Sequence, residues 1–298
     1  MKVLMATDGS VHAATAMLTA SRLMRTTNME VDVVCVGPEP ATPPGIAKGL
    51  RIQYKQQAVS NTRKTLEEAQ RILSQLHVKT HGLLEAGSPA DKLLALGPGY
   101  ELTIVGAYGQ HERKQPGLGP VASRVLQQGR GNLMVGRELL NERNFRVLVA
   151  LDSSESSFAA LEALGSLFDP TSIEVTLMHV IETSWSTPSV TSQEDGFDTA
   201  ELGEYHQQLE RELRRTADSI VEKGRRRLEM LRIPSSSLIT EGDPALELCS
   251  EAEQGGYDLV VAGATGASDV KHALLGSVSL KLAWDAPSSV AIFRQSVA

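Results

Sequence analysis

Glycine and serine residues in the last part of the chain follow a regular spacing that suits phosphate binding. The pattern is Gly-x2-Gly-x9-Gly-Ser, with Gly263, Gly266, Gly276 and Ser277 at the fixed positions and Ser279 two residues later. Glycine has no Cβ, so the backbone can come close to a ligand. A helix that begins near Gly276 would direct its free N–H groups and the positive end of its dipole at an anion, and the two serine hydroxyls can donate further hydrogen bonds. We therefore predict a phosphate cradle.

Two more positions lie where predicted strands end. Asp152 follows the apolar run 147–151, and its carboxylate can accept a hydrogen bond from an adenine amino group or a ribose hydroxyl. Val180 closes another apolar run, and its backbone can pair with the adenine edge. Taken alone, Asp152 is better explained as a turn or helix-cap residue, and the glycines can simply mark a loop with no ligand. Their joint occurrence at strand ends that one fold brings together favours a nucleotide site instead.

The elements that must position these residues occur twice. Each half of the chain opens with an apolar run that ends in aspartate, at Asp8 and at Asp152. A serine two residues later, Ser10 or Ser154, is a typical helix N-cap. The matching features that follow are a second strand (31–36 and 175–180), a cap-proline pair (Ser88-Pro89 and Asp243-Pro244), a strand (102–105 and 259–262) and a last strand (133–135 and 289–293). The chain is therefore predicted to be a tandem repeat.

A long helical stretch lies between the second strand and the cap-proline pair in each half, and its apolar residues recur at intervals of three and four. These residues are Ile52, Val59, Leu66, Ala69, Leu73 and Leu76 in the first half, and Leu202, Tyr205, Leu209, Leu213, Ala217, Ile220, Leu228 and Leu231 in the second. Each stripe is predicted to pack on a sheet. Strands that alternate with helices and are apolar on both faces favour a doubly wound α/β domain in each half, with ligands at the carboxyl ends of the first and fourth strands.

Composition excludes several other classes of protein. The 298 residues suit two domains of ordinary size. No run approaches the roughly 18 apolar residues of a membrane span. A net charge of −7 argues against a nucleic-acid surface, and the one dense basic run, 225–227, is expected to be a solvated helix face. The start of the chain lacks the pattern of a secretory signal, which predicts a cytoplasmic protein. Cys35 and Cys249 are expected to be buried, inert thiols.

The glycine pattern, Asp152 and Val180 together resemble the universal stress protein superfamily in its tandem two-domain form, and the resemblance covers essentially the whole chain. It implies two α/β domains, 1–140 and 141–298, each a doubly wound parallel five-stranded sheet of strand order 3-2-1-4-5, joined near Asn141 to Asn144. It also implies an ATP site, accompanied by Mg²⁺ or Mn²⁺, in the second domain. The matching positions are Ala150, Asp152, Val180, Ala262, Gly263, Gly266, Gly276, Ser277, Val278 and Ser279.

Lys271 lies between the glycines, at a place where members of the family often carry a basic residue. Two interpretations are open: it screens the triphosphate, or it is a solvated lysine.

The first half departs from the family pattern on the phosphate side. Asp8, Val36, Gly106, Gly109 and Gly119 keep the base-side positions and the glycine spacing. Proline stands at position 120 and alanine at position 122, so one or two phosphate hydrogen bonds are lost. We predict that this first site is weak or empty. Because the next N–H groups of the helix remain, weak nucleotide binding there stays open.

The leading functional hypothesis is a stress-response regulator or sensor that binds ATP. The resemblance implies at most slow hydrolysis or autophosphorylation, and the chain has no Gly-x4-Gly-Lys-Ser/Thr loop of a fast ATPase. Two alternatives remain. An adenylate-forming enzyme would carry Ser-Gly-Gly-x-Asp-Ser after its first strand, and neither half has the paired glycines. An interaction module with vestigial sites is the third hypothesis, and ATP binding distinguishes it from the first.

Assembly is expected to follow from the repeat. In the family, domains pair through their last strands, and 133–135 and 290–293 supply two such strands in one chain. An exposed apolar edge invites association, so we expect the two halves to pair within the chain, and two chains to form a homodimer that acts on a further signalling partner. The Ser/Thr-rich loop 183–199 either covers the second site, contacts a partner or is simply mobile.

Overall fold

A computed structural model describes residues 1–24, 29–39, 48–110, 117–140, 144–182, 199–266 and 275–294. The first half contains β1 (Lys2–Thr7), α1 (Val11–Leu23), β2 (Glu30–Gly37), α2 (Lys48–Gln75), β3 (Thr80–Ala86), α3 (Pro89–Leu96), the 3₁₀ turn η1 (Gly97–Gly99), β4 (Leu102–Gly106), α4 (Pro120–Gln128) and β5 (Leu133–Gly136). The second half contains β6 (Phe145–Ala150), α5 (Glu155–Leu167), β7 (Ile173–Glu182), α6 (Thr199–Met230), β8 (Ser235–Gly242), α7 (Pro244–Gln254), β9 (Leu259–Gly263), α8 (Ser277–Asp285) and β10 (Ser289–Phe293). The tandem repeat is therefore present in the fold. Most of the predicted linker 141–144 lies outside the described residues.

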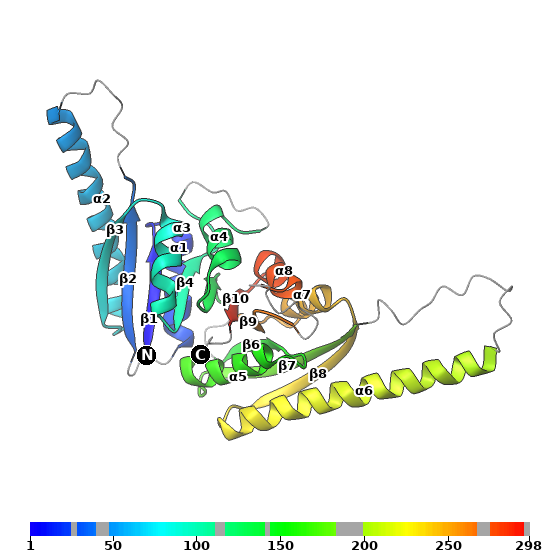
Figure 1. Ribbon diagram of the computed structural model, residues 1–298. Coiled ribbons are helices and arrows are strands. Elements are labelled where there is room, and N and C mark those ends of the chain that lie inside the picture. Colours follow the sequence, from blue (N-terminus) through cyan, green and yellow to red (C-terminus); the bar gives the residue numbers. More distant parts are fainter. Residues whose placement is uncertain are drawn as a thin grey trace.

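All of these strands form one ten-stranded sheet, in the order β3-β2-β1-β4-β5-β10-β9-β6-β7-β8 (Figure 1). Strands within each half are parallel and follow the predicted order 3-2-1-4-5. At the centre β5 and β10 pair antiparallel, with Val290 opposite Val135 and Ile292 opposite Leu133. The predicted pairing of the two halves through their last strands is thus confirmed, and it merges the two sheets into one.

Helices cover both faces of the sheet, and an apolar core lies on each face. One core contains residues of α1, α2, α5 and α6, and the other contains residues of α3, α4, α7 and α8. Successive residues of a strand point to opposite faces, so at the central pair Met134 and Ala291 enter the first core while Val135 and Val290 enter the second. Each core therefore continues from one half into the other.

The predicted helix caps are confirmed. Ser10 accepts a hydrogen bond from the N–H of Ala13 at 3.0 Å, and Ser154 accepts one from Ser157 at 3.1 Å. Pro89 and Pro244 follow the capping residues of α3 and α7. These caps satisfy backbone donors at the start of each helix and fix where the polypeptide turns after β1 and β6.

Two arginines that follow the last strands tie each half to the other. The guanidinium of Arg137 donates to the carbonyls of Ala283 and Ser288 at 2.8 and 3.1 Å. That of Arg294 donates to the carbonyls of Leu126 and Gly131, both at 2.7 Å. Each cation thus lies at the carboxyl end of a helix, α8 or α4, where the dipole is negative. Burial lowers the pKa of both groups, that of Arg294 to about 10.

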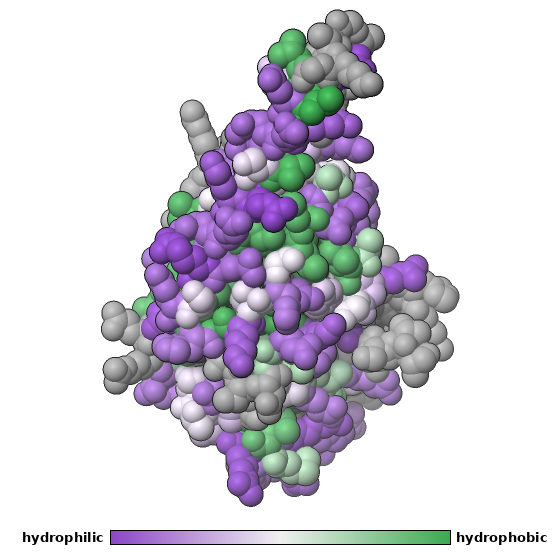
Figure 2. Space-filling model, turned by 90° about the vertical axis from the view of Figure 1, so that its left-hand side faces the viewer, coloured by the Kyte–Doolittle hydropathy of each residue, from purple (hydrophilic) through white to green (hydrophobic). Residues whose placement is uncertain are grey.

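Helices α2 and α6 are longer than the sheet they cover. With 28 and 32 residues they span about 42 and 48 Å, whereas strands of seven or eight residues span about 23 to 26 Å. Figure 1 shows both helices running past the sheet, and in Figure 2 hydrophobic residues lie among hydrophilic ones on the side that carries α2. Leu73 and Leu228 are buried, but Ile52, Val59 and Tyr205 are 49%, 50% and 62% exposed. The prediction that the whole stripe packs on the sheet is wrong for these amino-terminal turns.

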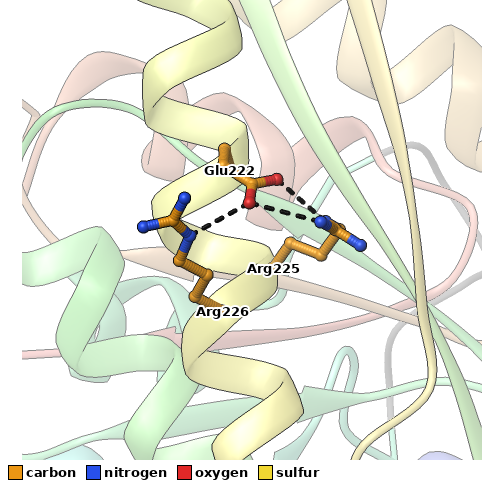
Figure 3. Close-up of polar contacts among 3 residues, drawn as sticks. All are labelled: Glu222, Arg225 and Arg226. Atoms are coloured by element: carbon orange, nitrogen blue, oxygen red, sulfur yellow. Dashed lines mark hydrogen bonds and ion pairs between the residues drawn. The ribbon is translucent and has the colours of Figure 1, made fainter.

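The basic run 225–227 lies on the surface of α6, and its arginines are paired with carboxylates. Arg225 and Arg226 both donate to Glu222, at 2.9 and 3.0 Å (Figure 3), and these contacts lower the pKa of Glu222. Arg227 pairs with Glu162 at 2.8 Å. The prediction of a solvated helix face is confirmed, and the run does not form an unpaired basic patch. In the part of the chain that the structure describes, no helix is both long and apolar enough to span a bilayer.

Candidate functional site

The carboxyl ends of β6, β7 and β9 and the start of α8 enclose a cavity of about 270 Å³ in the second half. Every residue that the sequence predicts for the second-half site lines this cavity, with the exception of Lys271. Lys271 lies outside the described residues. The fold therefore brings together positions that are more than a hundred residues apart in the sequence, such as Asp152 and Ser277, at the edge of the sheet where doubly wound proteins bind ligands.

Helix α8 begins at this cavity with no side-chain cap. Its N-cap is Gly276, whose N–H donates to the carbonyl of Ala264 at 2.6 Å and so closes the loop that follows β9. The first N–H groups of a helix have no intrahelical partner, and Ser277, Val278 and Ser279 carry these groups at the cavity wall. The side chain of Ser277 is exposed, and no hydrogen bond of its hydroxyl occurs among the described residues. This turn can therefore receive an anion.

Ser279 has a different part in the site from the one the sequence predicts. Its side chain is buried, and the hydroxyl donates to the carbonyl of Gly263 at 2.5 Å. A carbonyl can only accept, so the hydroxyl proton is used within the protein. Ser279 therefore holds α8 against the end of β9, and its N–H rather than its hydroxyl is left to face an anion.

Gly263 is also needed for a reason other than the predicted one. A Cβ at this position would lie 2.5 Å from Oγ of Ser156 and 2.7 Å from the backbone nitrogen of Ser157. The clash is with the first turn of α5 and not with a ligand. Gly106 has the same role in the first half, where a Cβ would lie 2.8 Å from the backbone carbon of His12. Glycine at this position lets the fourth strand of each half approach the first helix.

Asp152 fits both interpretations that the sequence leaves open. Its Oδ1 accepts hydrogen bonds from the N–H and the hydroxyl of Ser154, at 2.9 and 2.5 Å, so it orders the turn before α5. The same carboxylate lines the cavity. Across the cavity, Val180 lies two residues beyond Met178, the last residue of β7 that is paired with β6. Asp152 thus lies two residues beyond the end of β6, whereas Val180 lies within β7, which continues to Glu182 alongside β8.

Several polar groups of the cavity are absent from the sequence prediction. Nδ1 of His179 lies 2.8 Å from the carbonyl of Leu151, which can only accept, so Nδ1 carries a proton and donates to it. Glu182, Thr265 and Ser157 also line the cavity. A histidine within the apolar run 175–180 is a signal that could have identified His179 from the sequence.

A smaller cavity, of about 120 Å³, occupies the equivalent place in the first half. All five predicted first-half residues line it: Asp8, Val36, Gly106, Gly109 and Gly119. The N–H of Gly119 donates to the carbonyl of Ala107 at 2.8 Å, which repeats the loop closure of the second half. The backbone is therefore arranged in the same way around the two cavities.

The side chains around the two cavities differ in polarity. Positions that are polar in the second half are apolar, aromatic or without a donor in the first. The pairs, second half then first, are Ser157 and Ala13, His179 and Cys35, Thr265 and Tyr108, Ser277 and Pro120, and Ser279 and Ala122. Helix α4 consequently begins with a proline, which has no N–H to offer. The first cavity keeps its carboxylate, and its other polar side chains are those of Thr7 and Tyr108.

The two cysteines are free thiols. Burial, reinforced by the nearby charge of Asp8, raises the pKa of Cys35 to about 11, so this thiol stays protonated and unreactive near neutral pH, as predicted. Cys249 is only half-buried, and burial raises its pKa as well. Within the described ranges, no group of three His, Cys, Asp or Glu side chains is placed to hold a metal ion.

Comparison with known proteins finds one family in both halves. The sequence model of the "Universal stress protein family" matches residues 1–137 and 144–294. Universal stress protein YxiE of Bacillus subtilis (strain 168) is 28% identical over 154 residues, which cover 50% of this chain and 98% of that protein.

Two solved structures share the fold over the whole chain. A universal stress protein from Archaeoglobus fulgidus DSM 4304 has a TM-score of 0.64 and 20% identity, and the match covers 98% of each chain. A protein of unknown function from Pseudomonas aeruginosa PAO1 has a TM-score of 0.57 and 10% identity, over 98% of this chain and 92% of that one. At these identities the likeness supports the arrangement of the elements.

Proposed function

Since the chain belongs to the universal stress protein family, we propose that it is a cytoplasmic stress-response regulator that binds one Mg-ATP in the second-half cavity. In this proposal residues 141–298 form the nucleotide-binding domain and residues 1–140 form a domain with a degenerate site. The observation that carries it is the uncapped start of α8 at the cavity wall, with the Ser277 hydroxyl beside it. The two free cysteines suit a reducing compartment.

The cavity residues suggest how the nucleotide would lie. The triphosphate would receive hydrogen bonds from the first turn of α8 and from Ser277. The adenine would pack against Ala150, Val180 and Ala262, and Asp152 would accept a hydrogen bond from the base or the ribose. Mg²⁺ or Mn²⁺ would be held mainly by phosphate oxygens, because the described residues supply no three-ligand metal site.

ATP is proposed to act through occupancy, with at most slow turnover. The chain lacks the Gly-x4-Gly-Lys-Ser/Thr loop that positions phosphates for fast hydrolysis. A regulator of this kind requires that the nucleotide-bound state persist long enough to be recognised by another protein. We also propose a homodimer, in which the exposed apolar residues on the projecting turns of α2 and α6 are candidates for the contact, because β5 and β10 already pair within the chain.

Hydrogen–deuterium exchange of the full chain tests the proposed site. Saturating Mg-ATP is expected to slow exchange of the amides of Ser277, Val278 and Ser279, because these N–H groups would donate to phosphate oxygens. The amides of Val121 and Ala122 at the start of α4 serve as the internal control and are expected to keep their rates. Unchanged exchange at the start of α8 would instead favour an interaction module with vestigial sites.

A further inference from the structure

The cavity of the first half keeps Asp8 and Val36 on its base side, but its phosphate side has lost the serine donors of the second half. We infer that it is a site for an unphosphorylated purine, either a free base or a nucleoside, and not a weakened copy of the ATP site. This inference rests on the proposed function, because it takes the base side of the second-half cavity as its reference. It assigns the two cavities of one chain to two different classes of ligand.

The base side of the first cavity keeps its carboxylate and the valine across from it. Asp8 orders the turn before α1 as Asp152 does before α5, with Oδ1 accepting from the N–H of Ser10 at 2.9 Å. Its Oδ2 accepts from the backbone N–H of Gln110 at 3.0 Å. A carboxylate oxygen can accept more than one hydrogen bond, so Asp8 can still receive a donor from a purine. Val36 lies at the end of β2, and apolar residues such as Val34 and Val105 complete the wall.

The phosphate side of this cavity has become unsuitable for an anion. Pro120 stands at the position of Ser277 and has neither its N–H nor its hydroxyl. Val121 and Ala122 line the wall that follows. Tyr108 occupies the position of Thr265, and its ring packs edge-on against His12 with centroids 5.1 Å apart. An anionic triphosphate placed against these groups would meet fewer donors than in the second cavity, because the N–H and hydroxyl of the first helical residue are both missing. A neutral ring would instead gain apolar and aromatic contacts.

The first cavity is smaller than the second as well as less polar. Its volume of about 120 Å³ is less than half that of the second cavity, at about 270 Å³. Pro120, Ala122 and Tyr108 change the phosphate side, while on the base side Ala13 and Cys35 replace Ser157 and His179, and Asp8 and Val36 are kept.

Equilibrium dialysis of the full chain with labelled adenosine, in the presence of saturating Mg-ATP, tests this inference. ATP blocks the second cavity, so we expect one adenosine to bind per chain in addition to one ATP. An Ala122→Phe change, which fills the first cavity, is expected to weaken adenosine binding by at least about tenfold and to leave one Mg-ATP per chain. If this variant loses ATP as well, its fold is damaged, and the double change Pro120→Ser with Ala122→Ser takes its place.

In that double change, Pro120→Ser restores the missing N–H and hydroxyl donors, and Ala122→Ser restores the hydroxyl that holds the start of the helix in the second half, both with little added volume. It is expected to raise the Mg-ATP capacity from one to two per chain and to abolish the additional adenosine. One ATP but no adenosine on the wild-type chain would overturn the inference and leave the proposed function intact. Adenosine binding to a chain that takes no ATP would support the first-cavity site and overturn the proposed function. Equal affinity of the first cavity for ATP and adenosine would also overturn the inference.

Discussion

A Ser277→Pro variant is expected to bind Mg-ATP about a hundredfold or more weakly than the wild-type chain. The change removes the Ser277 hydroxyl and its N–H, and each hydrogen bond to a charged group contributes about 1.5 to 3 kcal/mol. The backbone should tolerate it, because α4 already begins with Pro120 at the equivalent position and proline suits the first residue of a helix. Isothermal titration calorimetry with Mg-ATP measures the loss.

A Ser277→Ala variant is the matched control, since it removes the hydroxyl and keeps the N–H. We expect it to lose about tenfold in affinity, which corresponds to one hydrogen bond. Thermal unfolding without nucleotide should be unchanged in both variants. If the proline variant keeps the affinity of the wild type, the start of α8 does not bind the phosphates.

A Gly263→Ala variant is expected to lose both stability and ATP affinity. The new Cβ would lie 2.5 Å from Oγ of Ser156 and 2.7 Å from backbone atoms of α5, so the helix must move. Overpacking of this kind typically lowers the free energy of unfolding by about 1 to 3 kcal/mol. The movement also displaces the turn that Asp152 and Ser154 form at the cavity. Urea unfolding and calorimetry measure the two effects.

Gly106→Ala in the first half separates these two effects. Its Cβ would meet the backbone of His12 at 2.8 Å, so a comparable loss of stability is expected. ATP affinity should stay near the wild-type value, because the second cavity is untouched. An equal loss of ATP binding in both variants would mean that Gly263 acts on overall folding and not on the site.

The sequence predicts most of the fold because its strands are buried and its helix caps are specific. Apolar runs such as 31–36 and 259–262 correspond to β2 and β9 within a residue or two at each end. No residues are predicted for the third strand of each half, β3 or β8. Both are half-exposed edge strands that begin with polar residues, Thr80 and Ser235, and so lack an apolar run.

For the candidate site, the sequence predicts which residues line the cavity better than it predicts what each of them contacts there. Glycine and serine spacing selects the cavity wall, but spacing cannot show that Gly263 is required by α5 or that the Ser279 hydroxyl is bound to Gly263. Such contacts depend on how β9 approaches α5 and α8. His179 and Glu182 were missed because the prediction along β7 considered only Val180, whereas the cavity extends over neighbouring residues of the same strand.

The number of ATP molecules bound per chain tests the central claim most directly. Calorimetric titration of the full chain with Mg-ATP should give one site per chain, with heat that disappears in the Ser277→Pro variant. This result would place ATP in the second-half cavity alone. Two sites of similar affinity would contradict the account, because Pro120 and Ala122 would then support phosphate binding as well as Ser277 does, and the absence of any binding would contradict it altogether.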